Sequence, residues 1–132
     1  MGRYAGFVRD NVRWAIYGRD SYRCGHCGLD MTDNHDQLSL DYVIPWETSV
    51  RTSGKADHRP QNLITCCKLC NSSRGMKPLR AFVQAAGILV RIMEQTSTAL
   101  TREDIAAGQV AYLADRARRG YGQQGQEQEQ AA

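Results

Sequence analysis

Two pairs of cysteines constrain the fold of this chain more than any other feature. The first pair is Cys24 and Cys27 and the second is Cys67 and Cys70, with two residues between the members of each pair. Paired turns of this kind present thiolates at the spacing of a tetrahedral Zn²⁺ site, and four thiolates complete it. Such a closed site leaves no open coordination position. We therefore expect a structural zinc ion whose binding is part of folding.

The fifth cysteine, Cys66, adjoins the second pair, but only Cys67 keeps the two-residue spacing to Cys70. We expect Cys66 to be a core thiol outside the metal site. The sequence shows no apolar leader and no apolar run long enough to cross a bilayer, so we expect a cytoplasmic protein without a membrane segment. In a reducing compartment, cysteines bind metal more often than they form disulfides.

Hydrophobic periodicity predicts an order of helix, strand, loop, strand and helix around the cysteines. Apolar residues at helical spacing predict a helix that ends near Gly18, and alternating apolar residues after residue 37 predict a strand that runs to Pro45. Residues 46–60 are polar, basic and rich in turn formers, which predicts a long hairpin loop. A second short strand is expected at residues 62–65, and a short helix at residues 67–75.

Two further helices are expected in the C-terminal part of the chain, at residues 78–95 and 101–118. The second begins with Thr101 and has Asp104 three residues later, which is close to a capping box. Residues 119–132 are rich in Gln and Gly and are expected to be disordered.

Positive charge is concentrated in the middle of the chain. Residues 50–80 contain seven basic side chains against the single acid Asp57. This concentration favours a polyanionic partner, although a solvated loop and helix face would show the same composition. The side chains expected to contact DNA phosphates are Arg51, Lys55, Arg59, Arg74, Lys77 and Arg80.

Four short motifs occur in the order that is characteristic of one nuclease family. They read CGHC, LDYVIP, QNLITC and CKLCNSSRG, and together they resemble the HNH endonucleases. The resemblance implies an α+β fold with a ββα-metal core at residues 12–80, stapled by zinc and flanked by an N-terminal helix and C-terminal helices. We expect one domain over residues 1–118.

The resemblance also implies roles for individual side chains. Asp41 and Asn71 match the positions that clamp one divalent ion, and their oxygen donors suit Mg²⁺ or Mn²⁺. Asn62 matches the residue that orients the general base or holds the loop. Position 42, where the family has its catalytic histidine, is a tyrosine.

Tyr42 leaves three interpretations open, because a phenol with a reference pKa of about 10 is a poor base at neutral pH. Its pKa could be lowered by the metal ion and neighbouring arginines. The base could instead be another residue, and His58 and His35 are the candidates. The chain could also be inactive through a change of His to Tyr. His26 is expected to be an exposed residue of the first cysteine turn.

The predicted function is a metal-dependent hydrolase that nicks or cuts DNA, leaving 5′-phosphate and 3′-hydroxyl ends, in a restriction or phage setting. The alternative is a disabled HNH-derived zinc module that binds DNA or a protein partner. The C-terminal helices could also join two chains in a homodimer.

Overall fold

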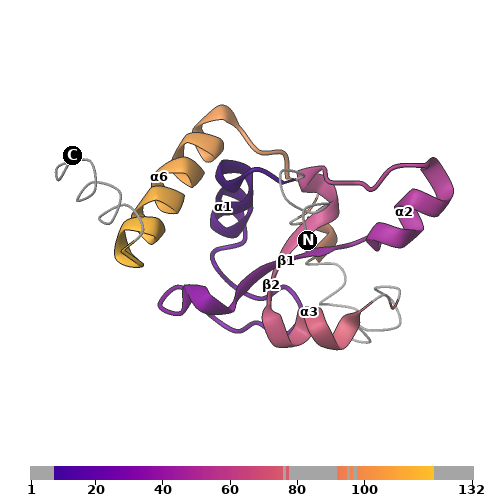
Figure 1. Ribbon diagram of the computed structural model, residues 1–132, viewed down its shortest axis with the longest axis horizontal. Coiled ribbons are helices and arrows are strands. Elements are labelled where there is room, and N and C mark those ends of the chain that lie inside the picture. Colours follow the sequence, from indigo (N-terminus) through magenta and orange to yellow (C-terminus); the bar gives the residue numbers. More distant parts are fainter. Residues whose placement is uncertain (1–7, 76, 78–91, 95, 97, 121–132) are drawn as a thin grey trace, which may run out of the picture.

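The computed structural model describes residues 8–75, 77, 92–94, 96 and 98–120, with the backbone alone described at residues 46 and 47. It has an α+β fold in which helices surround a two-stranded antiparallel sheet (Figure 1). This confirms the predicted class. Most of the helix expected at residues 78–95 and nearly all of the C-terminal tail lie outside the described residues. Among those described, no helix has the length and apolar character needed to cross a membrane.

The first helix, α1, spans Asp10–Arg19 and ends where predicted. Its buried side chains are Trp14, Ala15, Ile16 and Tyr17. The end of α1 is tied to the sheet by polar contacts, because Arg19 donates a hydrogen bond to the carbonyl of Leu63 and the carboxylate of Asp20 accepts one from the amide of Thr65. These contacts fix the position of the first cysteine pair, which follows α1 directly.

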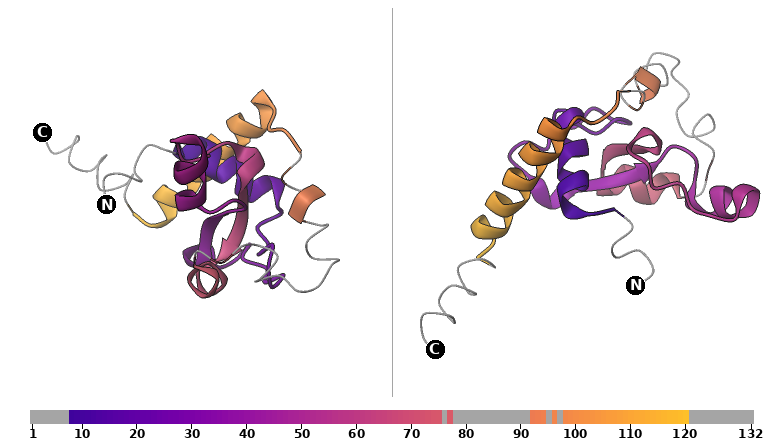
Figure 2. Two further views of the ribbon diagram at one scale, coloured as in Figure 1. Left: turned by 90° about the vertical axis from the view of Figure 1, so that its right-hand side faces the viewer. Right: turned by 90° about the horizontal axis from the view of Figure 1, so that it is seen from above.

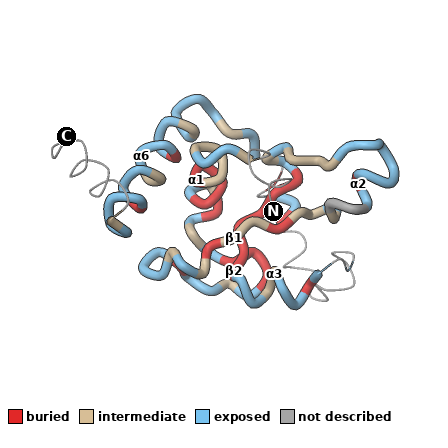
Figure 3. Tube along the Cα trace, viewed as in Figure 1, coloured by how far each residue is buried: buried red, intermediate tan, exposed pale blue. Residues whose placement is uncertain are grey.

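The sheet consists of β1 (Leu38–Tyr42) and β2 (Leu63–Cys67), paired antiparallel with Asp41 opposite Ile64 and Tyr42 opposite Leu63. The predicted strand β1 is present, but it ends at Tyr42 and not at Pro45. The expected alternation of burial is not observed, because Asp41 is buried whereas Leu40 and Tyr42 are only half-buried. Strand β2 begins and ends slightly later than expected. Every residue of β2 is buried, so this strand forms the centre of the core (Figure 3).

The segment between the strands contains a helix where a loop was expected. Helix α2 spans Trp46–Ser53 and projects away from the body of the molecule (Figures 1 and 2). It follows Pro45, and it ends at Gly54, whose φ of 80° is a left-handed conformation suited to glycine. The Ser and Thr residues that suggested turns therefore lie within a helix, bounded by a proline and a glycine at its ends.

Helix α3 spans Lys68–Arg74, as predicted. The Cys67 thiol caps its first turn by accepting a hydrogen bond from the amide of Cys70, and the helix ends at Gly75. The second cysteine pair thus lies at the junction of β2 and α3.

Helix α6 spans Arg102–Arg118 and packs against α1. Its first turn has the predicted capping box between Thr101 and Asp104. The two helices approach closely at Gly108, where an added Cβ would lie 2.3 Å from the carbonyl oxygen of Asn11 and 2.6 Å from the amide nitrogen of Ala15. Any larger residue at this position would push the helices apart.

Candidate active site and metal centre

The four paired cysteines come together in space. One thiol each from Cys24, Cys27, Cys67 and Cys70 lies within 4.8 Å of the others. The sulfur atoms of Cys27 and Cys67 are 3.8 Å apart, which is about the edge length of a tetrahedron built with Zn–S bonds of about 2.3 Å. The donor set and its spacing therefore fit a structural metal ion.

Position separates the fifth cysteine from the four ligands, because Cys66 lies outside the four-thiol cluster. Cys66 is fully buried and lies beside Ser39, whose hydroxyl is 3.3 Å from its sulfur. It is a core thiol, as predicted. Thiol ionisation makes no such division. Burial opposes ionisation of Cys24, but hydrogen bonds from backbone amides outweigh it and lower the pKa of this thiol to about 7. Burial raises the pKa of Cys27 and Cys70 as well as that of Cys66.

Asp41, an expected ligand of the divalent ion, is buried against two basic side chains. Its Oδ2 accepts hydrogen bonds from His26 Nε2 and Arg74 Nη1, each at 2.8 Å. The expectation that His26 is exposed is wrong, because the closed cysteine turn presses its ring against β1 and leaves it only 7% exposed. One donor atom each from His26, Asp41 and Cys66 falls within 4.8 Å, but the positive charge of Arg74 disfavours a cation at this cluster.

Arg74 was expected to contact DNA, and its burial contradicts this, because it is 1% exposed. Besides the carboxylate of Asp41, its guanidinium donates to the main-chain carbonyls of Tyr42, Val43 and Lys77. A guanidinium with its donors used in this way holds the end of β1 against α3 and cannot reach a phosphate.

Asn71 lies on α3 beside β1, where its amide group donates to the hydroxyl of Ser39 and the carbonyl of Leu40. The oxygen donors of Asp41 and Asn71 have the right chemistry for Mg²⁺ or Mn²⁺. Arg74 already neutralises the carboxylate, however, so the pair does not fit a divalent ion in this arrangement. The divalent-ion site stays a prediction, and it requires Arg74 to leave Asp41.

Asn62 makes the contacts of a loop clamp. Its Oδ1 accepts from the amide of Ile44, and its Nδ2 donates to the carbonyls of Ile44 and Asp57. One buried side chain thus joins the segment that follows β1 to the segment that precedes β2. Of the two roles expected for Asn62, these contacts correspond to holding the loop.

The clamp brings Tyr42 and His58 together. The phenol oxygen of Tyr42 lies 2.9 Å from Nδ1 of His58, within hydrogen-bonding distance. Asp57 precedes His58, and the hydrogen bond from Arg59 lowers the pKa of its carboxyl group, so Asp57 is ionised at neutral pH. Tyr42, at the position where the resemblance to HNH endonucleases implies a catalytic histidine, therefore contacts a histidine from the opposite side of the hairpin.

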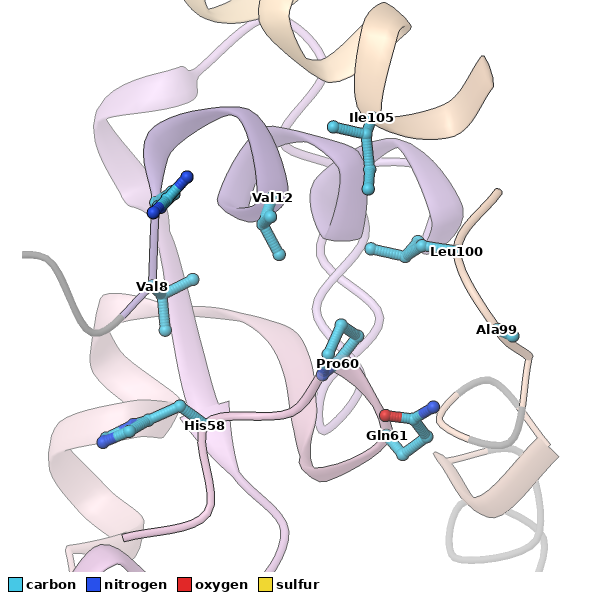
Figure 4. Close-up of a pocket in the computed structure, with 9 residues that line it drawn as sticks. Val8, Val12, His58, Pro60, Gln61, Ala99, Leu100 and Ile105 are labelled. Carbon is cyan, nitrogen blue, oxygen red and sulfur yellow. The ribbon is translucent and has the colours of Figure 1, made fainter. Parts of the chain in front are cut away.

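His58 borders two cavities. One, of about 460 Å³, is lined by the basic groups Lys55 and Arg59, by the acid Asp57, and by a mixture of hydroxyl and apolar side chains. The other, of about 380 Å³, is lined mainly by apolar side chains of α1 and the segment that leads into α6, including Val12 and Leu100 (Figure 4). A charged substrate is compatible with the first cavity.

The other candidate base, His35, lies elsewhere. Its ring stacks on Tyr22, meets Trp14 edge-on and contacts the carboxylate of Asp115 on α6. These contacts place His35 in the packing of α1 and α6, and not beside Tyr42.

The remaining basic residues expected at the DNA surface divide into two groups. Arg51, Lys55, Arg59 and Lys77 are exposed, and Arg59 is paired with Asp57. Arg80 lies outside the described residues. The exposed group includes both basic residues that line the larger cavity beside His58.

Residues 24–77 match the protein family described as HNH endonuclease. The matched segment begins at the first cysteine of the metal site and includes β1, α2, β2 and α3. Comparison with curated proteins and with solved structures gives no match.

Proposed function

We propose that this chain is a DNA endonuclease that hydrolyses phosphodiester bonds and leaves 5′-phosphate and 3′-hydroxyl ends, because residues 24–77 match the HNH endonuclease family. The observation that carries the proposal is the contact between Tyr42 and His58 at the end of the β-hairpin. It places an imidazole next to the position where the family has its catalytic histidine. The cavity beside His58 that Lys55 and Arg59 line is suited to a phosphodiester.

We propose Zn²⁺ as the ion of the four-cysteine site, because four thiolates with tetrahedral spacing are its preferred structural ligands. The ion would join the turn before β1 to the start of α3. It would contribute stability and no chemistry, since four protein ligands leave no position for water or substrate.

Cleavage of supercoiled plasmid by the zinc-loaded chain tests the function. We expect nicked or linear product in the presence of Mg²⁺ or Mn²⁺, the ions that the family resemblance implies. EDTA is expected to abolish the product, in a control where metal analysis shows that zinc is retained. Substrate that stays supercoiled with either ion, under conditions where the chain binds it, would contradict the proposal.

A second candidate function follows from the ion pair between Arg74 and Asp41. If the ion pair between Arg74 and Asp41 never opens, Asp41 cannot bind a divalent ion. The chain is then an inactive nuclease that binds DNA through its zinc-binding domain. Tyr42→His distinguishes a lost base from a closed ion site. Cutting by Tyr42→His where the starting chain is inert would show that only the base was lost, whereas two inert proteins would favour the binding module.

DNA affinity is expected to depend on α2 and the loop that follows it. Changing Arg51, Lys55 and Arg59 together to Gln should weaken DNA binding to a similar extent for DNA molecules of different sequence. It should also flatten the dependence of log K on log salt by about 0.9 for each phosphate that the variant no longer neutralises. Fluorescence anisotropy over a series of salt concentrations measures both effects.

The matched control changes Arg23, Arg102 and Arg116 to Gln, because these exposed residues lie outside this segment. The control should keep the slope of the starting chain. If the slope of log K against log salt were equal for the starting chain and both triple variants, α2 and its loop would lie outside the DNA interface.

A further inference from the structure

We propose that Tyr42 and His58 form a proton relay, in which the phenol takes the proton of the attacking water and passes its own proton to Nδ1 of His58. This inference rests on the proposed nuclease function. It assigns the two residues different parts: Tyr42 meets the reacting water, and His58 is the final proton acceptor behind it.

Geometry is the first support for the relay. Tyr42 is the last residue of β1, and its phenol oxygen reaches Nδ1 of His58 at 2.9 Å from across the hairpin. The Asn62 clamp holds both sides of this contact, since it binds Ile44 two residues after Tyr42 and the carbonyl of Asp57 immediately before His58. The pair is therefore held by the same buried amide.

Acid–base chemistry is the second support. A phenol with a reference pKa of about 10 accepts a proton poorly at neutral pH, whereas an imidazole with a reference pKa of about 6.5 accepts one readily. If the phenol gives up its proton as it receives another, it never exists as a phenolate. The relay thus supplies an imidazole base at a position that a phenol occupies.

The step balances without a further reactant. The water oxygen forms the new bond to phosphorus, the bond from phosphorus to the 3′ oxygen breaks, and that oxygen takes a proton from solvent water. The proton lost by the attacking water ends on Tyr42, and the phenolic proton ends on His58. The imidazolium then returns its proton to solvent.

The surroundings of His58 contain charges of both signs. Asp57 is the neighbouring acid, and the basic groups that line the cavities on its two sides are Arg9, Lys55 and Arg59. Asp57 is itself paired with Arg59. The basic groups would draw the phosphodiester into the cavities that His58 lines.

Three variants test the relay through cleavage rate. Tyr42→Phe and His58→Gln should each lower the rate by about 100-fold or more, which is the contribution of a positioned acid–base group. Adding Tyr42→His to His58→Gln should restore cutting, because an imidazole at position 42 needs no acceptor behind it. His35→Gln, a matched change in the packing of α1 and α6, should cut like the starting chain.

Other outcomes overturn the relay. A His58→Gln protein that cuts normally would make Tyr42 sufficient, and a Tyr42→Phe protein that cuts normally would make His58 the direct base. A covalent adduct of protein and DNA on a denaturing gel would make Tyr42 a nucleophile. Failure of the double variant to recover activity, with its zinc and fold intact, would reduce His58 to a structural role.

A measurement without DNA separates failure of the relay from failure of the nuclease function. Nitrogen NMR of the zinc-loaded chain should show that Nδ1 of neutral His58 lacks a proton and accepts a hydrogen bond, and that Tyr42→Phe shifts this signal. A proton on Nδ1 would mean that the phenol accepts the hydrogen bond, which contradicts the relay whether or not the chain cuts DNA.

Discussion

Removing the metal ion from the four-cysteine site is expected to unfold the domain. The four thiols come from the turn before β1 and from the junction of β2 and α3, so an ion held by them would join the two ends of the matched HNH segment. Structural zinc sites bind with about 10–16 kcal/mol, which is as large as the whole stability of a typical domain, about 5–15 kcal/mol. A strong chelator should therefore abolish the cooperative thermal transition in circular dichroism.

Two cysteine variants sharpen this test. Cys70→Ser removes one ligand and should lower both the zinc content and the melting temperature. Cys66→Ala removes a buried thiol outside the site and should keep stoichiometric zinc. An unchanged melt of the starting chain after verified metal loss would show that the thiols fold the domain without an ion.

Arg74→Met is expected to lower the free energy of unfolding by about 3–5 kcal/mol. The change removes the guanidinium from the buried carboxylate of Asp41, which keeps its contact with His26, and it removes the hydrogen bonds from Arg74 to the carbonyls of Tyr42 and Val43. Methionine is apolar and flexible enough to fill the space, so the loss reports mainly the missing charge and hydrogen bonds. Urea unfolding of the zinc-loaded protein measures it.

The matched control combines Arg74→Met with Asp41→Asn. Neutralising the buried carboxylate should recover part of the lost stability, so the double variant should be more stable than Arg74→Met alone. If Arg74→Met does not fold, the same comparison can be made from the yield of soluble, zinc-loaded protein. Equal stability of Arg74→Met and the starting chain would show that the ion pair contributes nothing.

The sequence predicted most of the framework because the framework depends on local chemistry. The C-x2-C spacing and the capping box at Thr101 each reflect contacts between residues that are close in the chain. Helix α2 was missed because its Ser and Thr residues are as common in turns as in short helices. The better signals were Pro45 and Gly54 at its two ends.

The polar contacts around Asp41 and Tyr42 were harder to predict, because they join residues that are far apart in the chain. Arginine is usually exposed, and nothing adjacent to Arg74 indicates that the carboxylate of Asp41 and the end of β1 will surround it. His26 lies between two predicted ligands, and only closure of the site turns its ring towards Asp41. The contact between Tyr42 and His58 joins residues on opposite sides of the hairpin. The sequence named both residues but could not pair them.

Helix α2 stands outside the buried core, between a proline and a glycine that end it cleanly (Figures 1 and 3). The hydrogen bonds that Asn62 and Arg74 make involve no described side chain of α2. Substitutions at its exposed positions are therefore expected to change one wall of the cavity beside His58, which Thr52 and Ser53 line, while leaving those hydrogen bonds in place.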